Sequence, residues 1–327
     1  MYPIRCLLFG SLLFFGLVFV RCSPEKDRFR FESAGRPVPE FSADYAVDAI
    51  QKQIDFGARY PGSSAHQETR NFLVESLQSY AGKRNVYVQT FLHTGYDEVN
   101  MELYNIVASF NPESPVRVLL AAHWDTRPRS ENDEDSPASP LIGADDGGSG
   151  VGVLLELARL FQNESPPIGV DIILFDGEDY GRSGDLHHFF LGSRYWSQNP
   201  PVANYNPRFG VLLDMVGGVG ARFSKETYSR QFAPNLVEAV WSLAHEMGFE
   251  KTFPDREGAA VSDDHVMVNR YTDIPMINII HHERGQDGTA QFPSWWHTQQ
   301  DRMEIIDPET LQVVGDLMVE LVYNRIN

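Results

Sequence analysis

One stretch constrains the fold more than any other, and it begins with the apolar run VRVLLAA at residues 116–122. This run predicts a buried strand, and His123 and Asp125 follow it directly. A loop then closes on Asp145 and Asp146, after which the residues of GVGVLLELARL are apolar at helical spacing. A histidine, aspartates and a helix start therefore meet at the carboxyl end of a strand. In open α/β sheets, functional sites are built at that edge.

The remaining chain alternates between strand and helix patterns. The sequence predicts strands at residues 86–92, 102–110, 116–122, 170–175, 209–216 and 274–280, and helices at 43–56, from Ser63 or Ser64 through Leu77, at 236–247 and at 308–323. The Asn111-Pro112 turn predicts that strands 102–110 and 116–122 are antiparallel neighbours. The expected fold is a single α/β domain with a mixed, mostly parallel central sheet and helices on both faces.

The N-terminus has the pattern of an export signal. Arg5 precedes an apolar run at residues 7–20 that is short for a membrane span, so residues 1–22 are interpreted as a signal segment. Residues 23–41 are polar and predict a tether or an N-terminal arm, and residues 42–327 form the predicted catalytic domain. Cys22 resembles a bacterial lipoprotein cysteine although Arg21 before it fits poorly, so lipidation stays open. We expect a periplasmic or lipid-anchored envelope protein of a bacterium.

Charge and cysteine content exclude several classes of function. A net charge of −18 argues against nucleic acid and anionic lipid as partners, which leaves a lipid anchor at Cys22 as the only expected membrane contact. Both cysteines, Cys6 and Cys22, fall in the signal segment, so we expect neither a disulfide nor thiolate chemistry in the domain. We expect the domain to be a monomer.

Acidic residues and histidines collect where the predicted strands end. They are His123 and Asp125, the run Asp176–Asp179 with Glu178 inside it, Asp214, the run Ser262–His265, and His297 with Asp301 and Asp307 beyond it. Carboxylate and imidazole ligands without cysteine suit catalytic zinc, or a harder ion such as manganese. Three protein ligands would leave one position open, and a carboxylate beside it could act as general base and acid.

At this point the motifs carry a resemblance. GADDGGSG, FDGED, LLDM and WHT, in this order, resemble the zinc aminopeptidase superfamily and its zinc exopeptidase-like α/β fold. SDDH at residues 262–265 and FPSWWHT at residues 292–298 are most similar to glutaminyl cyclases, the glutaminyl-peptide cyclotransferases, of the bacterial, animal-like type. The resemblance runs from about residue 43 to the C-terminus. It implies that the N-terminal glutamine of peptides or proteins is cyclised to pyroglutamate with release of ammonia.

The resemblance also implies a role for individual positions. It implies one zinc ion held by Asp146, Asp179 and His297, with Asp179 standing where the animal enzymes have glutamate. Glu178 matches the proton shuttle, Asp214 and Asp263 match two aspartates hydrogen-bonded to it, and Trp296 and Phe292 match walls of the substrate pocket. A further pocket tryptophan of the animal enzymes is missing around Gly184, where Trp196 or Trp295 is the expected replacement.

Alternatives remain open at several positions. Asp264 or His265 could serve in place of Asp263, and the loop 127–140 is expected to be a solvated flap. In two-metal aminopeptidases the residue matching His123 binds a second ion, whereas in cyclases it is a bystander. The alternative function is therefore a di-zinc aminopeptidase that removes N-terminal residues. A third reading is a non-catalytic binding lipoprotein on the same scaffold.

Overall fold

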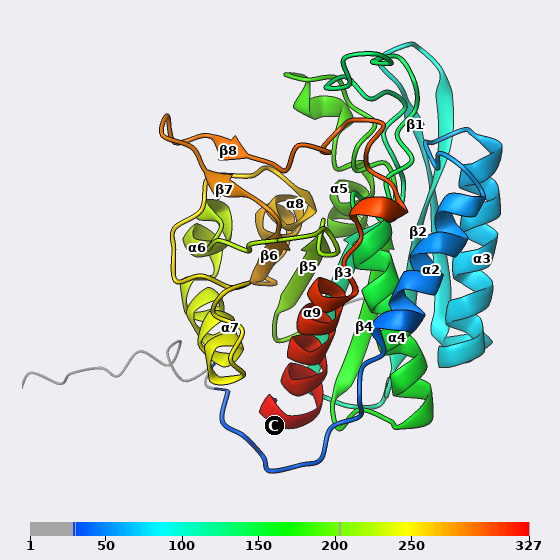
Figure 1. Ribbon diagram of the computed structural model, residues 1–327. Coiled ribbons are helices and arrows are strands. Elements are labelled where there is room, and N and C mark those ends of the chain that lie inside the picture. Colours follow the sequence, from blue (N-terminus) through cyan, green and yellow to red (C-terminus); the bar gives the residue numbers. More distant parts are fainter. Residues whose placement is uncertain (1–28, 30, 203, 327) are drawn as a thin grey trace, which may run out of the picture.

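The computed structural model describes residues 29, 31–202 and 204–326 (Figure 1). The predicted signal segment, with Cys6 and Cys22, lies outside the described residues. Within the described part, none of the helices has the length and apolar character needed to cross a membrane. The helices are α2 (Ala43–Asp55), α3 (Ser64–Ala81), α4 (Gly148–Asn163), α5 (Leu191–Gln198), α6 (Thr227–Phe232), α7 (Pro234–Glu246), α8 (Asp264–Tyr271) and α9 (Pro308–Glu320), with short 3-10 turns at Lys83–Asn85, Leu186–His188 and Met303–Ile305 and a π turn at Leu321–Arg325.

The strands form one six-stranded sheet and one small hairpin. They are β1 (Val86–Thr94), β2 (Asn100–Phe110), β3 (Arg117–His123), β4 (Gly169–Phe175), β5 (Gly210–Asp214) and β6 (Met276–Ile280), with β7 (Glu283–Arg284) and β8 (Ala290–Gln291) as the hairpin. The order in the large sheet is β1-β2-β4-β3-β5-β6. Strands β4, β3, β5 and β6 pair in parallel, whereas β1 and β2 are antiparallel at one edge. This confirms the predicted fold class.

The predicted pairing of the second and third strands is wrong. β4 lies between β2 and β3, pairing antiparallel with β2 and in parallel with β3. The Asn111-Pro112 turn does reverse the chain, but the connection passes the start of β4, where Asn111 Nδ2 donates to the carbonyl of Pro166 at 3.1 Å. Every residue of β4 is buried, and a fully buried strand is typical of the centre of a sheet with neighbours on both sides.

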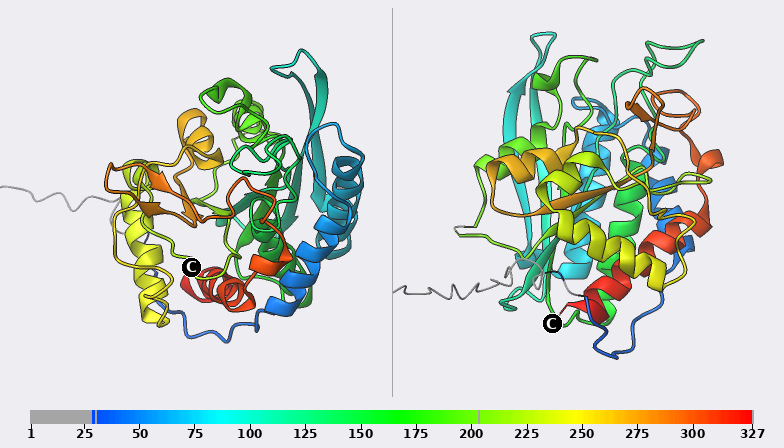
Figure 2. Two further views of the ribbon diagram at one scale, coloured as in Figure 1. Left: turned by 45° about the horizontal axis from the view of Figure 1, so that its top comes forward. Right: turned by 90° about the vertical axis from the view of Figure 1, so that its left-hand side faces the viewer.

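Helices cover both faces of the sheet, as the apolar strands require. One core cluster joins alternate strand residues such as Leu120, Ile172 and Leu213 with α4, α7 and α9. The other face places residues such as Ala121 and Ile173 against Trp196 of α5 and Val268 of α8. The left view of Figure 2 shows α4 and α9 on one side of the sheet and α5 and α8 on the other. All four parallel strands consequently end at one edge.

The N-terminal arm lies along the domain. In Figure 1 it runs below α7 and α9 before it enters α2. The rings of Phe29 and Phe31 pack on Phe209, with centroids 5.9 and 5.7 Å apart. Ala34 N donates to the carbonyl of Asn324 at 2.8 Å, so the arm also contacts the C-terminal turn.

Candidate active site

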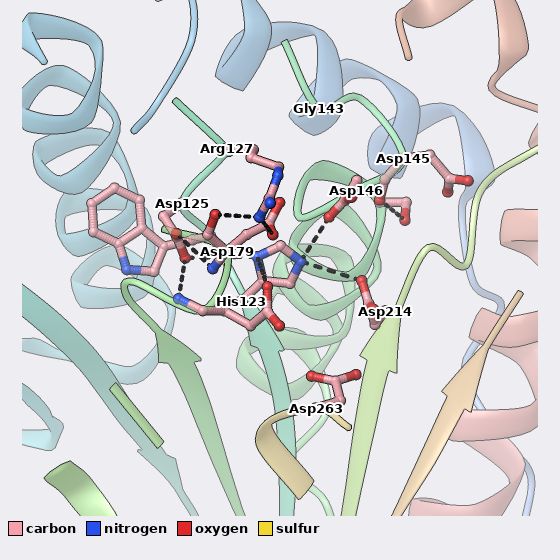
Figure 3. A network of polar contacts seen from close by, with 12 residues as sticks. His123, Asp125, Arg127, Gly143, Asp145, Asp146, Asp179, Asp214 and Asp263 are labelled. Atoms are coloured by element: carbon pink, nitrogen blue, oxygen red, sulfur yellow. Dashed lines mark hydrogen bonds and ion pairs between the residues drawn. The ribbon is translucent and has the colours of Figure 1, made fainter. Parts of the chain in front are cut away.

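The parallel strands deliver their last residues to one cluster (Figure 3). His123 is the last residue of β3 and Asp214 the last of β5, and Figure 3 shows both at the tips of their strands. Glu178 and Asp179 follow β4 after a turn in which Gly177 has φ 71°, a left-handed value that glycine adopts without strain. Asp146 lies two residues before α4 begins at Gly148 and reaches the same cluster.

The turn at Asp145 and Asp146 is fixed by residues from distant segments. Asp301 accepts hydrogen bonds from both backbone amides, at 2.7 Å from Asp145 and 3.0 Å from Asp146. The Asp145 carboxylate accepts from Gly217 N at 2.9 Å and from Trp295 Nε1 at 3.1 Å. Asp145 is therefore occupied by structural contacts, and Asp146 is the residue of the pair that faces the cluster.

Three side chains have the geometry of a zinc site. Ligand atoms of Asp146, Asp179 and His297 lie within 4.8 Å of one another. His297 Nε2 is 3.6 Å from Asp146 Oδ2 and 3.5 Å from Asp179 Oδ2. Tetrahedral ligands at bond lengths of about 2.0–2.2 Å lie roughly 3.3–3.6 Å apart, so these separations fit a zinc ion. Asp179 Oδ2 is buried and has no hydrogen-bond partner, as expected of an oxygen kept for a metal.

His123 forms a second group with two of the carboxylates. Its Nε2 is 3.2 Å from both Asp146 Oδ1 and Asp214 Oδ1, and the side chain is 1% exposed. These three residues also meet the spacing expected around a metal ion. Asp146 belongs to both groups and offers one oxygen to each, which is the arrangement that a bridging carboxylate would have.

Glu178 is held at the mouth of this cluster. Its backbone amide and that of Asp179 donate to the two oxygens of Asp125, at 3.0 and 3.3 Å. The Glu178 side chain is 12% exposed. Burial raises its pKa well above the usual range, His123 opposes that rise, and the carboxylates of Asp179 and Asp263 add to it. A carboxyl group in such an environment can both take up and return a proton near neutral pH.

Asp263 lies beside Asp214 in the lower part of Figure 3. It is the N-cap of α8, and its Oδ2 accepts from Asn278 Nδ2 at 2.5 Å. Burial and the nearby Asp214 carboxylate raise the pKa of Asp263 to about 7. Asp264, the alternative at this place, is fully buried, and neither of its carboxylate oxygens has a hydrogen-bond partner.

All eight predicted site residues line one pocket of about 220 Å³. They are Asp146, Glu178, Asp179, Asp214, Asp263, Phe292, Trp296 and His297. The Phe292 and Trp296 rings stack with centroids 4.3 Å apart, and Trp296 stacks on His297 at 3.9 Å. Drug-sized ligand sites typically occupy about 300–1,000 Å³, so this pocket suits the end of a chain.

A family model for peptidase family M28 matches residues 105–322, two thirds of the chain, and the match contains all of these residues. The chain belongs to peptidase family M28.

Similar proteins of known structure or function include both cyclases and a peptidase. The chain is 43% identical to the glutaminyl cyclase of Bacteroides thetaiotaomicron, bound to N-acetylhistamine, with a TM-score of 0.83 and coverage of 89% of this chain and 100% of that one. It is 42% identical to a leucine aminopeptidase precursor from the same organism, with a TM-score of 0.83 and coverage of 89% and 99%. Bovine glutaminyl-peptide cyclotransferase is 25% identical, covering 80% of this chain and 76% of that protein.

Neither tryptophan expected as a replacement near Gly184 lines the pocket of this M28 protein. Trp196 is 1% exposed and packs on Phe175 and Tyr205 in the core. Trp295 donates to Asp145 instead. The corresponding part of the wall is built from the loop after the acidic pair, by Ser183, Gly184, Leu186, Phe189 and Phe190.

The expectation of a solvated flap at residues 127–140 is wrong for its first part. Arg127 is 1% exposed and Ser130 is fully buried, and Arg127 and Glu131 both line the pocket. Their position could not be predicted from the local pattern, because a polar, Pro-rich run is typical of an exposed loop. The available signal was an arginine two residues after Asp125, at the end of a buried strand.

Proposed function

We propose that this protein cyclises the N-terminal glutamine of peptides or proteins to pyroglutamate and releases ammonia, with one zinc ion per chain. The observation that carries the proposal is Glu178, a largely buried carboxyl group beside the ligand group Asp146, Asp179 and His297 in a pocket closed by aromatic rings. The 43% identity to a glutaminyl cyclase over the whole of that chain supports it.

The residues of the pocket would have different roles in this reaction. Asp146, Asp179 and His297 would hold zinc, which when bound supplies Lewis acidity toward the side-chain carbonyl of the substrate glutamine. Glu178 takes a proton from the α-ammonium group, and the free amine then attacks the side-chain carbonyl carbon. Glu178 returns this proton to the leaving nitrogen as the carbon–nitrogen bond breaks, and the attacking nitrogen loses its second proton to solvent, so that a pyroglutamyl product and ammonia are formed. Asp263 and Asp214 would keep the Glu178 carboxyl oriented and share its proton, consistent with the raised pKa of Asp263.

The size and lining of the pocket support a terminal residue as substrate. A volume of about 220 Å³ admits one side chain, and the Phe292–Trp296 stack offers a flat apolar wall for its methylene groups. Several carboxylates around the pocket favour a positively charged amino terminus.

The rival function is a two-metal aminopeptidase. The second ligand group at His123, Asp146 and Asp214 favours it, and so does the identity to a leucine aminopeptidase precursor. Incubation with a Gln-initiated peptide and with a Leu-amide distinguishes the two functions. The proposal predicts ammonia and a pyroglutamyl product from the first and no free leucine from the second. Free leucine without ammonia would contradict it.

We further infer that the protein is exported through residues 1–22 and acts as a monomer in the bacterial periplasm or on the envelope. Signal cleavage exposes new N-termini on exported proteins, so these are the substrates we expect. The mass of the mature protein separates plain cleavage from lipid attachment at Cys22, and its elution volume on gel filtration tests the monomer. A mature chain that retains residues 1–22 would contradict export.

A further inference from the structure

A buried arginine contacts one of the proposed zinc ligands from behind. The Arg127 guanidinium donates from Nη1 to Asp179 Oδ1 at 2.6 Å and to the Asp179 carbonyl at 3.0 Å. Its Nε donates to Glu131 Oε2 at 2.5 Å, and its Nη2 donates to Glu131 Oε1. One Asp179 oxygen is thus bound by arginine, and only Oδ2 is left to face Asp146 and His297.

Glu131 extends this contact to a second ligand. Its Oε1 lies 3.3 Å from His297 Nδ1, at ion-pair distance but without the geometry of a hydrogen bond. A carboxylate at this position favours a proton on Nδ1, which leaves the lone pair of Nε2 for a metal. Nε2 is the atom that points at Asp146 and Asp179. Arg127 and Glu131 therefore connect two ligands that are 118 residues apart in the sequence (297 − 179).

The backbone of the same loop supports the loop that carries His297. His297 has φ 56°, a left-handed value that is unfavourable for a residue other than glycine and persists only where the surroundings fix it. Asn132 N donates to the His297 carbonyl at 3.1 Å. Gln299 Nε2 donates to Ser130 Oγ at 2.6 Å. The loop thus contacts the strained segment on both sides of Glu131.

We propose that Arg127 and Glu131 are positioning residues that form a clamp behind the metal site, fixing Asp179 as a one-oxygen ligand and His297 as an Nε2 ligand. The clamp rests on the zinc site of the proposed function and deepens it. Partners that orient metal ligands from behind typically change metal affinity about 10–100-fold when they are substituted.

The positioning role of Arg127 depends on the shape of the guanidinium group rather than on its charge. Its planar fork donates to Asp179 and Glu131 at once, whereas the ammonium group of lysine is a single point charge on a flexible stem. Loss of the positive charge would by itself strengthen the attraction of the carboxylates for zinc. Arg127→Lys keeps the charge and removes the fork, so it separates the two effects.

The test measures zinc affinity by competition with a chelator in purified full-length variants, each with a thermal melt of the metal-free protein. The variants are Arg127→Lys, Glu131→Gln and the double variant. Arg129→Lys is the matched control, because Arg129 lies on the same loop but donates to the Gly181 carbonyl and to Tyr96 Oη, away from the ligands. The visible absorption spectrum of the cobalt-substituted protein reports ligand geometry independently of activity.

We expect both single variants to lower zinc affinity at least about tenfold and to alter the cobalt spectrum. The double variant should lose no more than the worse single variant, because the two residues act as one unit. Arg129→Lys should stay within about twofold of the wild type. Unchanged zinc affinity in Arg127→Lys and Glu131→Gln, or an equal loss in Arg129→Lys, would overturn the clamp. A wild-type protein that binds zinc but forms no pyroglutamate would overturn the proposed reaction and leave the clamp standing.

Discussion

Buried charged groups are fully hydrogen-bonded at one end of β3 and β4, whereas some lack partners at the other end. At their amino ends, Arg117 and Asp171 form a two-point ion pair at 2.6 and 2.9 Å, and Tyr205 and Ser109 also donate to Asp171 at 2.8 and 2.5 Å. At their carboxyl ends, His123 Nδ1 and Asp179 Oδ2 are buried without a hydrogen-bond partner. Satisfied charges stabilise a fold, whereas unsatisfied buried charges with shifted pKa values are typical of functional sites.

The largest expected effect is on catalysis at the carboxyl end. Glu178→Gln keeps the shape of the side chain but removes its ability to carry the proton. We expect ammonia release from a Gln-initiated peptide to fall about 100- to 10,000-fold. Zinc content by elemental analysis should stay unchanged, because Glu178 is not among the proposed ligands. A variant that keeps most of its activity with zinc bound would show that Glu178 is not the proton shuttle.

At the amino end the same kind of change should affect stability alone. Asp171→Ala leaves Arg117, Tyr205 and Ser109 without their shared acceptor. We expect the free energy of unfolding, measured in urea, to fall by about 3 kcal/mol. This is at the low end of the range for breaking a buried ion pair, because the Arg117 side chain is 17% exposed. The turnover number of the folded fraction should be unchanged. A lowered turnover number at full folding would mean that the two ends are coupled.

The pH dependence of the free energy of unfolding should reflect the buried carboxyl groups at the carboxyl ends of the strands. Burial raises the pKa of Asp145 to about 6 and that of Asp263 to about 7, so between pH 4.5 and 7 the folded protein binds protons that the unfolded chain has released. Stability supplied by a raised pKa is complete below the unfolded value and is lost as pH rises through the folded value.

The metal-free protein should therefore lose on the order of 5 kcal/mol of stability as pH rises through this window, about 2 from Asp145 and about 3 from Asp263. Two further carboxyls have lowered pKa values. Burial raises the pKa of Glu131, but His297 and Arg127 lower it to about 2, and His265 likewise lowers that of Glu226 to about 2. Both groups change the stability only below about pH 4.5, so they do not offset this loss. Urea titrations of the metal-free protein across the window measure the slope. Saturating zinc should reverse it, because metal binding requires the deprotonated ligands. Metal-free stability that rises with pH would contradict the assigned burial of these carboxyls.

The smallest effect is expected at the aromatic wall. Trp296→Ala removes half of the Phe292–Trp296 stack but no group that moves a proton. We expect KM for a Gln-initiated peptide to rise about tenfold, in line with the loss of one aromatic contact, with a smaller change in kcat. Phe292→Leu keeps an apolar surface and should change KM less. Steady-state kinetics with an unchanged KM in Trp296→Ala would place the substrate elsewhere in the pocket.

The strands, and the residues that gather at their carboxyl ends, could be predicted from the sequence because both leave local patterns. Long apolar runs mark β3, β4 and β5, and the residues just after each run are chemically distinctive. The position of β4 between β2 and β3 could not be predicted in this way, because pairing order depends on which strand needs neighbours on both sides. The roles of Asp145 and Asp146 separate only through Asp301 and Trp295, which reach them from more than 140 residues away.

Arg127 and Glu131 show the same limit at the site itself. Their loop is polar and rich in proline, and only its contacts with Asp179 and His297 distinguish it from a solvent-exposed turn. The missing pocket tryptophan near Gly184 is a related case. The separation of Trp196 from Gly184 in the sequence does not indicate whether the ring faces the pocket or the core. The ring contacts with Phe175 and Tyr205 place it in the core.

A zinc titration of the metal-free protein, followed by ammonia release from a Gln-initiated peptide, separates the single-zinc cyclase from the two-metal aminopeptidase. Ammonia release should reach its maximum at one equivalent of zinc, with Asp146, Asp179 and His297 sufficient for activity and a Leu-amide left intact throughout. A maximum only at two equivalents, accompanied by cleavage of the Leu-amide, would bring His123 and Asp214 into the metal centre and contradict single-zinc cyclisation.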